Sequence, residues 1–402
     1  MVKTISKRAM PMARHLYAAL CCLMPLAACK RLEKDTPPAV EAAIAGMQQK
    51  YCPDPRLCVF DIEVQTRGAN LRLAGEVSDA AAKREIVQSV KAAVDNFKVE
   101  EEIRLLPDEA LGDRRFGVVR VSVANLRSKP AHTAELVHQQ LLGSVLRLMK
   151  QEGNWYYVQT ADGYLAWAPA GSIQITDSAA VAAWRAASLV AFKATSGVMR
   201  AEPNIEAAAI SALVLGCVTE KTAEIAELNA ASKKKWLQLA LPDGRTGCVE
   251  RDFCANVSEV FPLVPRPPEH IIAQAMQFLG IPYLWGGTSV AGFDCSGFTQ
   301  TVFRLNGIAL LRDASQQARQ GERVHPGDDF ANLRPADLLF FGDRPGKITH
   351  VAISLGGARF IHASDFVQIN SLYPGDSDYA DDRRRTFQFA KRFFGQDHNP
   401  AN

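Results

Sequence analysis

Apolar and polar residues follow two different spacings over positions 37–108. In two segments the apolar residues recur every three or four positions, which is typical of helices with one buried face, and in three others they alternate with polar residues, which is typical of strands. The predicted elements are a helix over 37–51, strands over 59–65 and 71–77, a helix from Asp79 to about residue 95, and a strand over 98–105. This order predicts a small α-β-β-α-β domain in which Asp79 caps the second helix.

The next part of the chain contains a sequence repeat, whose anchors lie first 73 and later 81 positions apart. The matching segments are residues 125–130 with 198–203, Leu142-Gly143 with Leu215-Gly216, Trp155 with Trp236, and Asp162-Gly163 with Asp243-Gly244. One insertion of eight residues within 222–235 explains the change of spacing. Short strands, Asp-Gly turns and an aromatic residue near each end favour small barrels. The repeat therefore predicts two β-barrels, over residues 115–178 and 187–259.

A Pro-rich stretch at residues 261–269 separates the barrels from a chemically distinct C-terminal part. From Cys295 onward the apolar positions 298, 302 and 305 recur at helical spacing, so Cys295 lies in the first turn of a predicted helix. The unpaired N–H groups and the dipole at a helix start favour a thiolate over a thiol. The pattern therefore predicts a nucleophilic cysteine with a lowered pKa.

Two histidines follow on predicted strands. Gly356-Gly357 marks a hairpin between strands predicted over residues 350–355 and 359–363. His350 and His362 are 12 positions apart and nearly symmetric about this hairpin, so both should point to one face of the sheet. One imidazole can then take the thiol proton while the other orients it. Each of these side chains alone is more often structural, but a helix-start cysteine with two facing histidines predicts a thiol peptidase.

Composition and charge exclude several classes of function. The 46 Lys and Arg against 43 Asp and Glu leave a net charge of +3, which is too balanced for a protein that mainly binds a nucleic-acid backbone. No run of 18 apolar residues occurs, so no transmembrane helix is predicted. The chain has no C-x-x-C pair and no H-E-x-x-H segment, so no metal site is expected.

The first 29 residues are typical of a targeting segment and are excluded from the predicted fold. A basic start precedes a mostly apolar stretch that ends in Leu26-Ala27-Ala28-Cys29. This tetrad resembles the lipobox of bacterial lipoproteins, which implies a signal peptide over residues 1–29 and lipidation of Cys29. Lys30 then implies an anchor at the periplasmic face of the outer membrane, held by acyl chains. The alternative is an ordinary secretory signal that happens to contain Cys29.

Export would place the remaining cysteines in an oxidising compartment, where structural cysteines tend to pair. Cys52 and Cys58 flank a short Pro-containing loop and could close it. One further pair is expected among Cys217, Cys248 and Cys254, and their spacing does not choose between the alternatives.

Three parts of the chain resemble known domains. The unit over residues 37–108, with Leu73-Ala74-Gly75 at its turn, resembles the BON domain of exported bacterial proteins, and the two repeats resemble bacterial SH3-type domains. Residues 270–395 resemble the NlpC-type family of papain-like cysteine peptidases. The segments that carry this last resemblance are Gly280-Ile281-Pro282-Tyr283, Trp285-Gly286-Gly287, Asp294-Cys295-Ser296-Gly297-Phe298, Arg334-Pro335-Ala336-Asp337-Leu338 and His350-Val351. The implied fold is multidomain α+β, with a papain-like catalytic domain over residues 268–396.

The NlpC-type resemblance implies a role for four residues. Cys295 would be the nucleophile, His350 the base and His362 the residue that orients the base. Tyr283 would bind the oxyanion together with the backbone N–H of Cys295, and one such donor lowers a barrier by about 2.7–4 kcal/mol. The implied mechanism needs neither a metal nor an organic cofactor.

Two SH3-type domains before such a catalytic domain resemble the γ-D-glutamyl-L-diamino acid endopeptidases, which trim cell-wall peptides. This resemblance implies that the first barrel covers the active site, and that Glu135 and Tyr164 recognise the free amine of an N-terminal L-Ala. Asp294, Ser296 and Ser315 match further peptide-binding positions. The implied partners are peptidoglycan-derived peptides.

The second barrel departs from the SH3-type pattern, because Cys248 stands in the place of an aromatic residue in Gly247-Cys248-Val249. A spacer role is therefore expected for it. Two other functions stay open. A first barrel turned away from the site would permit cleavage of intact peptidoglycan, and an inert Cys295 would leave a non-catalytic peptidoglycan-binding lipoprotein.

Overall fold

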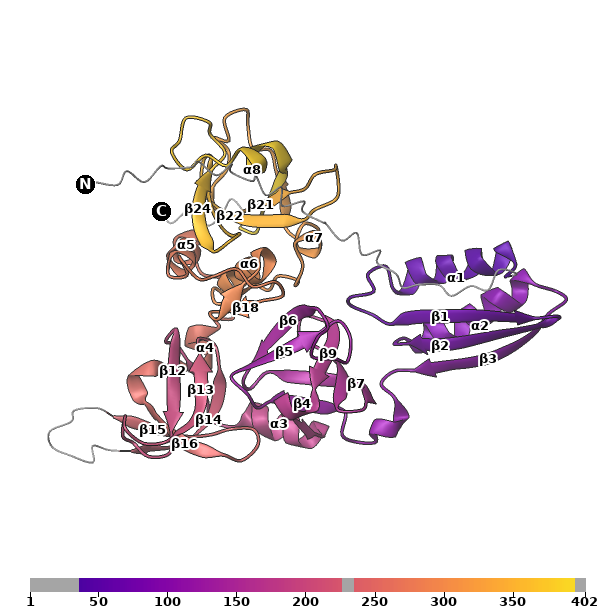
Figure 1. Cartoon of the computed structure of the whole chain (residues 1–402), viewed down its shortest axis with the longest axis horizontal. Coiled ribbons are helices and arrows are strands. Elements are labelled where there is room, and N and C mark those ends of the chain that lie inside the picture. The colour runs from indigo at the N-terminus through magenta and orange to yellow at the C-terminus, as the bar shows by residue number, and fades with distance from the viewer. Residues whose placement is uncertain (1–35, 226–234, 395–402) are drawn as a thin grey trace, which may run out of the picture.

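The computed structural model describes residues 36–225 and 235–394, which fold into an N-terminal domain, two barrels and a C-terminal domain (Figure 1). The predicted signal peptide and Cys29 lie outside the described residues, as does most of the predicted insertion in the second barrel. Among the described helices, none is long and apolar enough to cross a membrane.

The N-terminal domain has the predicted α-β-β-α-β order. Its elements are α1 (Pro38–Tyr51), β1 (Phe60–Arg67), β2 (Asn70–Val77), α2 (Ala80–Ala93) and β3 (Lys98–Leu105). Strand β2 lies in the middle of the sheet, antiparallel to β1 and parallel to β3. Asp79 caps α2 as predicted, because its carboxylate accepts a hydrogen bond from the N–H of Ala82 at 2.9 Å. The element order is confirmed, and membership of the BON family stays a prediction.

The two repeats form two barrels with the same spatial order of strands. The first contains β4 (Phe116–Val119), β5 (Val123–Arg127), β6 (Leu136–Leu141), β7 (Val145–Glu152), β8 (Trp155–Gln159), β9 (Leu165–Pro169) and β10 (Ile173–Thr176). The second contains β11 (Leu189–Phe192), β12 (Ser196–Arg200), β13 (Ala209–Val214), β14 (Val218–Ile225), β15 (Trp236–Ala240), β16 (Thr246–Glu250) and β17 (Cys254–Asn256). The first sheet runs β10-β4-β7-β8-β9-β5-β6 and the second β17-β11-β14-β15-β16-β12-β13, so each strand has a counterpart. Helix α3 (Ser178–Ala186) joins the barrels.

The C-terminal domain packs helices against a six-stranded sheet. Its helices are α5 (Pro268–Met276), α6 (Cys295–Arg304), α7 (Ala314–Gln317) and α8 (Asp381–Thr386). The sheet consists of β20 (Glu322–Val324), β21 (Pro335–Phe341), β22 (His350–Gly356), β23 (Arg359–Ala363), β24 (Val367–Ser371) and β25 (Phe387–Arg392). Two short strands, β18 (Thr288–Ser289) and β19 (Gly292–Phe293), pair separately. Helix α6 buries Phe298 and Val302 in one core with Val351 of β22, which brings Cys295 to the strand that begins with His350.

The second barrel and the C-terminal domain share this core. Ala191 of β11 and Val260 of α4 (Val257–Val260) are buried in the same apolar cluster as Phe298. Leu215 and Val218 of the barrel pack against the cluster from the side. The two domains therefore meet through apolar packing, which is more than a spacer requires.

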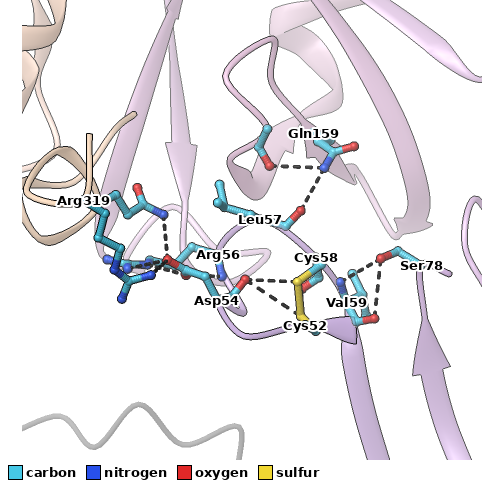
Figure 2. The surroundings of a disulfide bond; sticks show 11 residues. Cys52, Asp54, Arg56, Leu57, Cys58, Val59, Ser78, Gln159 and Arg319 are labelled. Atoms are coloured by element: carbon cyan, nitrogen blue, oxygen red, sulfur yellow. Dashed lines mark hydrogen bonds and ion pairs between the residues drawn. A yellow bond between two sulfur atoms is a disulfide. The ribbon is translucent and has the colours of Figure 1, made fainter. Parts of the chain in front are cut away.

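The cysteines confirm one prediction and contradict another. Cys52 and Cys58 form a disulfide, with their Cα atoms 5.5 Å apart (Figure 2). The pair expected among Cys217, Cys248 and Cys254 is wrong, because all three are buried free thiols of the second barrel. Cys217 and Cys254 belong to the apolar core of that barrel, where a free cysteine acts as a small hydrophobic residue.

Candidate active site

Cys295 begins helix α6, and its neighbour Asp294 is the N-cap of that helix. The Asp294 carboxylate accepts a hydrogen bond from the N–H of Gly297 at 2.7 Å, which fixes the first turn. Cys295 is only 8% exposed, yet it lines a pocket of about 500 Å³ together with Tyr283. The predicted nucleophile therefore sits at a helix start and faces a space that can hold a substrate.

His350 and His362 meet as predicted. The Nε2 atom of His350 lies 2.8 Å from Nδ1 of His362, and both rings are buried. On the far side, Nε2 of His362 lies 2.9 Å from Oδ1 of Asn370, while the Asn370 amide donates to the carbonyl oxygen of Asp378 at 3.0 Å.

This chain of hydrogen bonds determines where the ring protons lie. Because the amide of Asn370 donates to Asp378, its oxygen faces His362 and accepts from Nε2–H of that ring. Nδ1 of His362 then accepts from Nε2–H of His350, and the Nδ1 atom of His350 keeps its lone pair. His350 is thus held in the tautomer that can take a proton.

Asn370 is a site residue that the sequence reasoning missed. It lies on β24, where its neighbour in register is Phe360, two residues before His362 on β23. Asn370 and His362 therefore point to the same face of the sheet. The even spacing of eight residues across a second turn was a signal of the kind that linked the two histidines.

The electrostatics contradict one prediction. Burial raises the pKa of Cys295 to about 12, and the charge of the adjacent Asp294 adds to the rise. The helix start does not compensate, so the lowered pKa predicted for Cys295 is wrong for the substrate-free site. Burial lowers the pKa of His362 to about 4 and holds that of His350 well below its usual range. The resting site therefore pairs a neutral thiol with a neutral imidazole.

Tyr283 is the residue predicted to bind the oxyanion. It lines the pocket with Cys295, and its N–H donates to the carbonyl oxygen of Asp365 at 2.9 Å. Burial, followed by the charge of an ionised Cys295, raises the pKa of Tyr283. Its hydroxyl therefore stays protonated and can donate a hydrogen bond.

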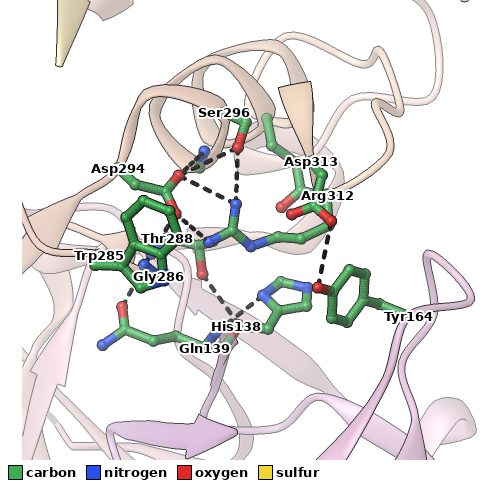
Figure 3. Close-up of polar contacts among 12 residues, drawn as sticks. His138, Gln139, Tyr164, Trp285, Gly286, Thr288, Asp294, Ser296, Arg312 and Asp313 are labelled. Carbon is green, nitrogen blue, oxygen red and sulfur yellow. Dashed lines mark hydrogen bonds and ion pairs between the residues drawn. The ribbon is translucent and has the colours of Figure 1, made fainter. Parts of the chain in front are cut away.

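Asp294 and Ser296 line the pocket, but both are engaged by Arg312 (Figure 3). The Arg312 guanidinium donates to Oδ1 of Asp294 at 3.1 Å and to the hydroxyl of Ser296 at 3.0 Å, and Oδ2 of Asp294 accepts from the N–H of Gly286 at 2.9 Å. Arg312 is 1% exposed and was also missed, although it opens the segment in which Ser315 was predicted. The network fixes the floor of the pocket beside Cys295.

The first barrel forms another wall of this pocket. Glu135 and Tyr164 line it, as the sequence predicts. Glu135 accepts a hydrogen bond from the Trp285 indole N–H at 2.7 Å, and the Tyr164 hydroxyl donates to Oδ2 of Asp313 at 3.3 Å. Ser315, on α7, lines the same pocket.

The contact between barrel and catalytic domain is close and polar. The side-chain oxygen of Gln139 accepts from the N–H of Thr288 at 3.0 Å and from the hydroxyl of Ser289 at 2.9 Å. Gly286 has a φ of +76°, and a Cβ there would lie 2.3 Å from the carbonyl oxygen of Leu136. Only glycine fits this approach. In the structure the first barrel is therefore packed over the site, not turned away from it.

No group of three or more His, Cys, Asp or Glu within residues 36–225 and 235–394 is arranged to hold a metal ion. The side chains that hydrogen bonds join at this site are His350, His362 and Asn370.

The comparisons with known proteins agree with this geometry. Residues 280–383 match the model of the NlpC/P60 family, and residues 126–173 match that of the bacterial dipeptidyl-peptidase Sh3 domain. The chain is 29% identical over 275 residues to dipeptidyl-peptidase 6 of Lysinibacillus sphaericus, an alignment that covers 63% of this chain and 91% of that protein. It is 29% identical over 243 residues to a γ-D-glutamyl-L-lysine dipeptidyl-peptidase of Bacillus cereus, covering 57% of this chain and 67% of that protein.

A solved structure of an NlpC/P60 family protein from Bacillus cereus superposes with a TM-score of 0.56 at 22% identity, covering 69% of this chain and 99% of the other. At that identity the likeness concerns the fold. The chain thus contains a bacterial dipeptidyl-peptidase Sh3 domain followed by an NlpC/P60 cysteine peptidase domain.

Proposed function

We propose that this peptidase hydrolyses the bond between γ-D-Glu and the diamino acid of peptidoglycan stem peptides that carry a free N-terminal L-Ala. The observation that carries the proposal is the shared pocket, in which Cys295 of the catalytic domain and Glu135 of the first barrel line one space of about 500 Å³. A barrel packed there limits the length of the substrate, and Glu135 offers a carboxylate to an ammonium group. The name of the Bacillus cereus relative supports the same bond.

The geometry supports a mechanism in two steps. Sγ of Cys295 attacks the γ-carbonyl carbon while its proton passes to Nδ1 of His350, because neither group is ionised at rest. The backbone N–H of Cys295 and the Tyr283 hydroxyl stabilise the oxyanion. His350 then protonates the leaving amine, which leaves a thioester on Cys295.

Water completes the cycle. His350, now neutral again, takes a proton from a water molecule that attacks the thioester carbonyl carbon. Collapse of the second tetrahedral intermediate returns the proton to Sγ of Cys295 and releases the γ-carboxyl product, L-Ala-D-Glu. Through both steps His362 and Asn370 keep the His350 ring in place.

The test uses L-Ala-γ-D-Glu-diaminopimelate and its N-acetylated twin, with products followed by mass spectrometry. Release of L-Ala-D-Glu from the free peptide, with the acetylated twin cleaved much more slowly, is expected. Equal cleavage of both would favour a general endopeptidase acting on intact peptidoglycan. Cleavage of neither would favour a binding protein. Cys295→Ala controls for a contaminating hydrolase.

For location, we propose an exported lipoprotein anchored through Cys29 at the periplasmic face of the outer membrane. Support comes from the Leu26-Ala27-Ala28-Cys29 segment and from the Cys52–Cys58 disulfide, since disulfides persist in oxidising compartments. Metabolic labelling with a fatty acid, lost in Cys29→Ala, tests the anchor. Membrane fractionation tests the compartment.

A further inference from the structure

The N-terminal domain reaches the active-site pocket through the loop that its disulfide closes. Figure 2 shows this loop, with Leu57 beside Gln159 of the first barrel. The carbonyl oxygen of Arg56 in this loop accepts from the N–H of Leu165 at 2.7 Å, and that of Leu57 accepts from the side chain of Gln159 at 3.0 Å. Both donors belong to the first barrel. Pro55 and Arg56 consequently line the same pocket as Cys295.

Arg56 is held firmly in this position. Its Nε and one terminal nitrogen donate to the two carboxylate oxygens of Asp54 at 2.8 and 2.7 Å, a bidentate pair. Asp54 is itself fixed by the Gln316 amide, which donates to it at 3.1 Å. Burial opposes the charges of this pair, but the Arg56 and Gln316 hydrogen bonds still lower the pKa of Asp54 to about 2.

The other terminal nitrogen of Arg56 crosses to the catalytic domain. It donates to Oδ2 of Asp313 at 2.7 Å and to the hydroxyl of Ser315 at 3.0 Å. A guanidinium has five N–H donors, and these contacts with Asp54, Asp313 and Ser315 use four of them. Arg56 therefore has too few free N–H groups to bind a substrate carboxylate through two hydrogen bonds as well.

Arg56 neutralises the negative charge of Asp313. Oδ2 of Asp313 also accepts from Tyr164, and the Asp313 side chain caps α7. Three acids line the pocket, namely Glu135 of the first barrel and Asp294 and Asp313 of the catalytic domain, and Asp294 is paired with Arg312. With Arg56 paired to Asp313, an incoming ammonium group meets the unneutralised charge of Glu135 alone.

We propose that Arg56 is a specificity-determining residue, through which the N-terminal domain sets how strongly the pocket discriminates substrates by the charge at their amino end. By neutralising Asp313 it weakens the preference for a free amine over a blocked one. The choice of peptide rests on the proposed function, whereas the change in pocket charge does not. The test therefore needs one reading with substrate and one without.

The first reading is the ratio of kcat/KM for L-Ala-γ-D-Glu-diaminopimelate to that for its N-acetylated twin. Arg56→Gln should raise this ratio about tenfold, because it removes the cation that is paired with Asp313 and Asp54 beside the pocket. Asp313→Asn should lower it, and the double variant should return it close to that of the native enzyme. Arg56→Lys, which keeps the charge, should leave it within about threefold.

A control variant is Arg72→Gln, which removes an exposed arginine of the same domain that pairs with Glu102 away from the pocket. It should leave the ratio unchanged. A ratio that falls in Arg56→Gln would overturn the proposal and assign Arg56 a direct contact with substrate. Equal losses on both peptides would overturn it in favour of a purely structural role.

The second reading uses the Cys295 thiol as a probe of pocket charge. Its rate of modification is measured with cationic 2-aminoethyl methanethiosulfonate and with neutral methyl methanethiosulfonate, and the label is located by peptide mass spectrometry. Arg56→Gln should raise the cationic-to-neutral ratio by several-fold, and an unchanged ratio would overturn the proposal. If the native chain cleaves neither peptide while this ratio still rises, the proposed substrate fails and the role of Arg56 stands.

Discussion

The two barrels share one strand order but do different work. The positions that the repeat aligns are Glu135 with Ala208, Tyr164 with Arg245, and Trp167 with Cys248. The first barrel therefore presents an acid and a phenol to the catalytic pocket, whereas the second has neither at those places. The backbone pattern determines that a barrel forms, and a few residues at its loops determine whether that barrel takes part in recognition.

In the second barrel, the polar residue aligned with Tyr164 makes structural hydrogen bonds. Arg245 donates to Asp243 at 2.9 Å and to the carbonyl oxygen of Arg120, in the first barrel, also at 2.9 Å. Its apolar residues meet the catalytic domain in a common core. The comparison thus separates a barrel that lines the catalytic pocket from a barrel that packs against the catalytic domain.

The largest difference should come from substituting one cysteine in the catalytic domain and one in the second barrel. Cys295→Ala should lower kcat by at least about 10⁴-fold, since it removes the nucleophile. Cys248→Ala, at the position of the second barrel that aligns with Trp167, should leave kcat/KM within about twofold, because Cys248 is a buried free thiol that does not line the pocket. Peptide hydrolysis followed by mass spectrometry measures both. Strong loss in Cys248→Ala would break the distinction between the barrels.

The thiols should also differ in alkylation and its dependence on pH. The raised pKa of Cys295 means that its thiolate fraction grows about tenfold per pH unit, so the rate with iodoacetamide should rise about 100-fold from pH 6 to pH 8. Burial also raises the pKa of Cys217 and Cys254 in the second barrel, and neither lines the catalytic pocket, so they should stay unlabelled. A rate at Cys295 that is flat between pH 5 and 8 would instead indicate a resting thiolate–imidazolium pair.

A smaller effect is expected from the acid of the first barrel. Glu135→Gln should lower kcat/KM for the free-amine peptide about 10- to 100-fold, the usual range for a hydrogen bond to a charged group. The N-acetylated peptide should lose far less. Glu206→Gln, an exposed acid in the corresponding loop of the second barrel, should change neither value. Equal losses for both peptides in Glu135→Gln would argue against recognition of the amine.

The smallest effect should come from the phenol. Tyr164→Phe removes only the hydroxyl that donates to Asp313, so kcat/KM should fall about three- to tenfold. Tyr156→Phe in the same barrel, at a partly buried position outside the pocket lining, is the matched control. Steady-state kinetics on the free-amine peptide measures both. A larger loss in Tyr156→Phe than in Tyr164→Phe would contradict the assigned contact.

Local patterns were enough to predict much of the fold and part of the site. The spacing of apolar residues predicted the helices and strands of the N-terminal domain, the repeat predicted both barrels, and an even separation about a hairpin brought His350 and His362 together. Each of these depends on neighbours within one element or one turn.

Other residues around the pocket depend on contacts that no local pattern contains. Arg56 meets Asp313 across 257 positions of sequence, and Gln139 meets Thr288 across 149. The pKa of Cys295 was predicted in the wrong direction because the helix start is a local feature, whereas burial depends on the packing of the whole domain. The free thiols of the second barrel were mispredicted for the same reason, since compartment alone does not bring two sulfur atoms together.

The core shared by the second barrel and the catalytic domain has a practical consequence. The Pro-rich stretch at residues 261–269 is the apparent place to divide the chain, yet Ala191 and Val260 before it pack with Phe298 after it. The two domains should therefore unfold together as one cooperative unit. A shortened version of the enzyme should begin before residue 187, because one that begins at residue 268 would expose an apolar face to water and tend to aggregate.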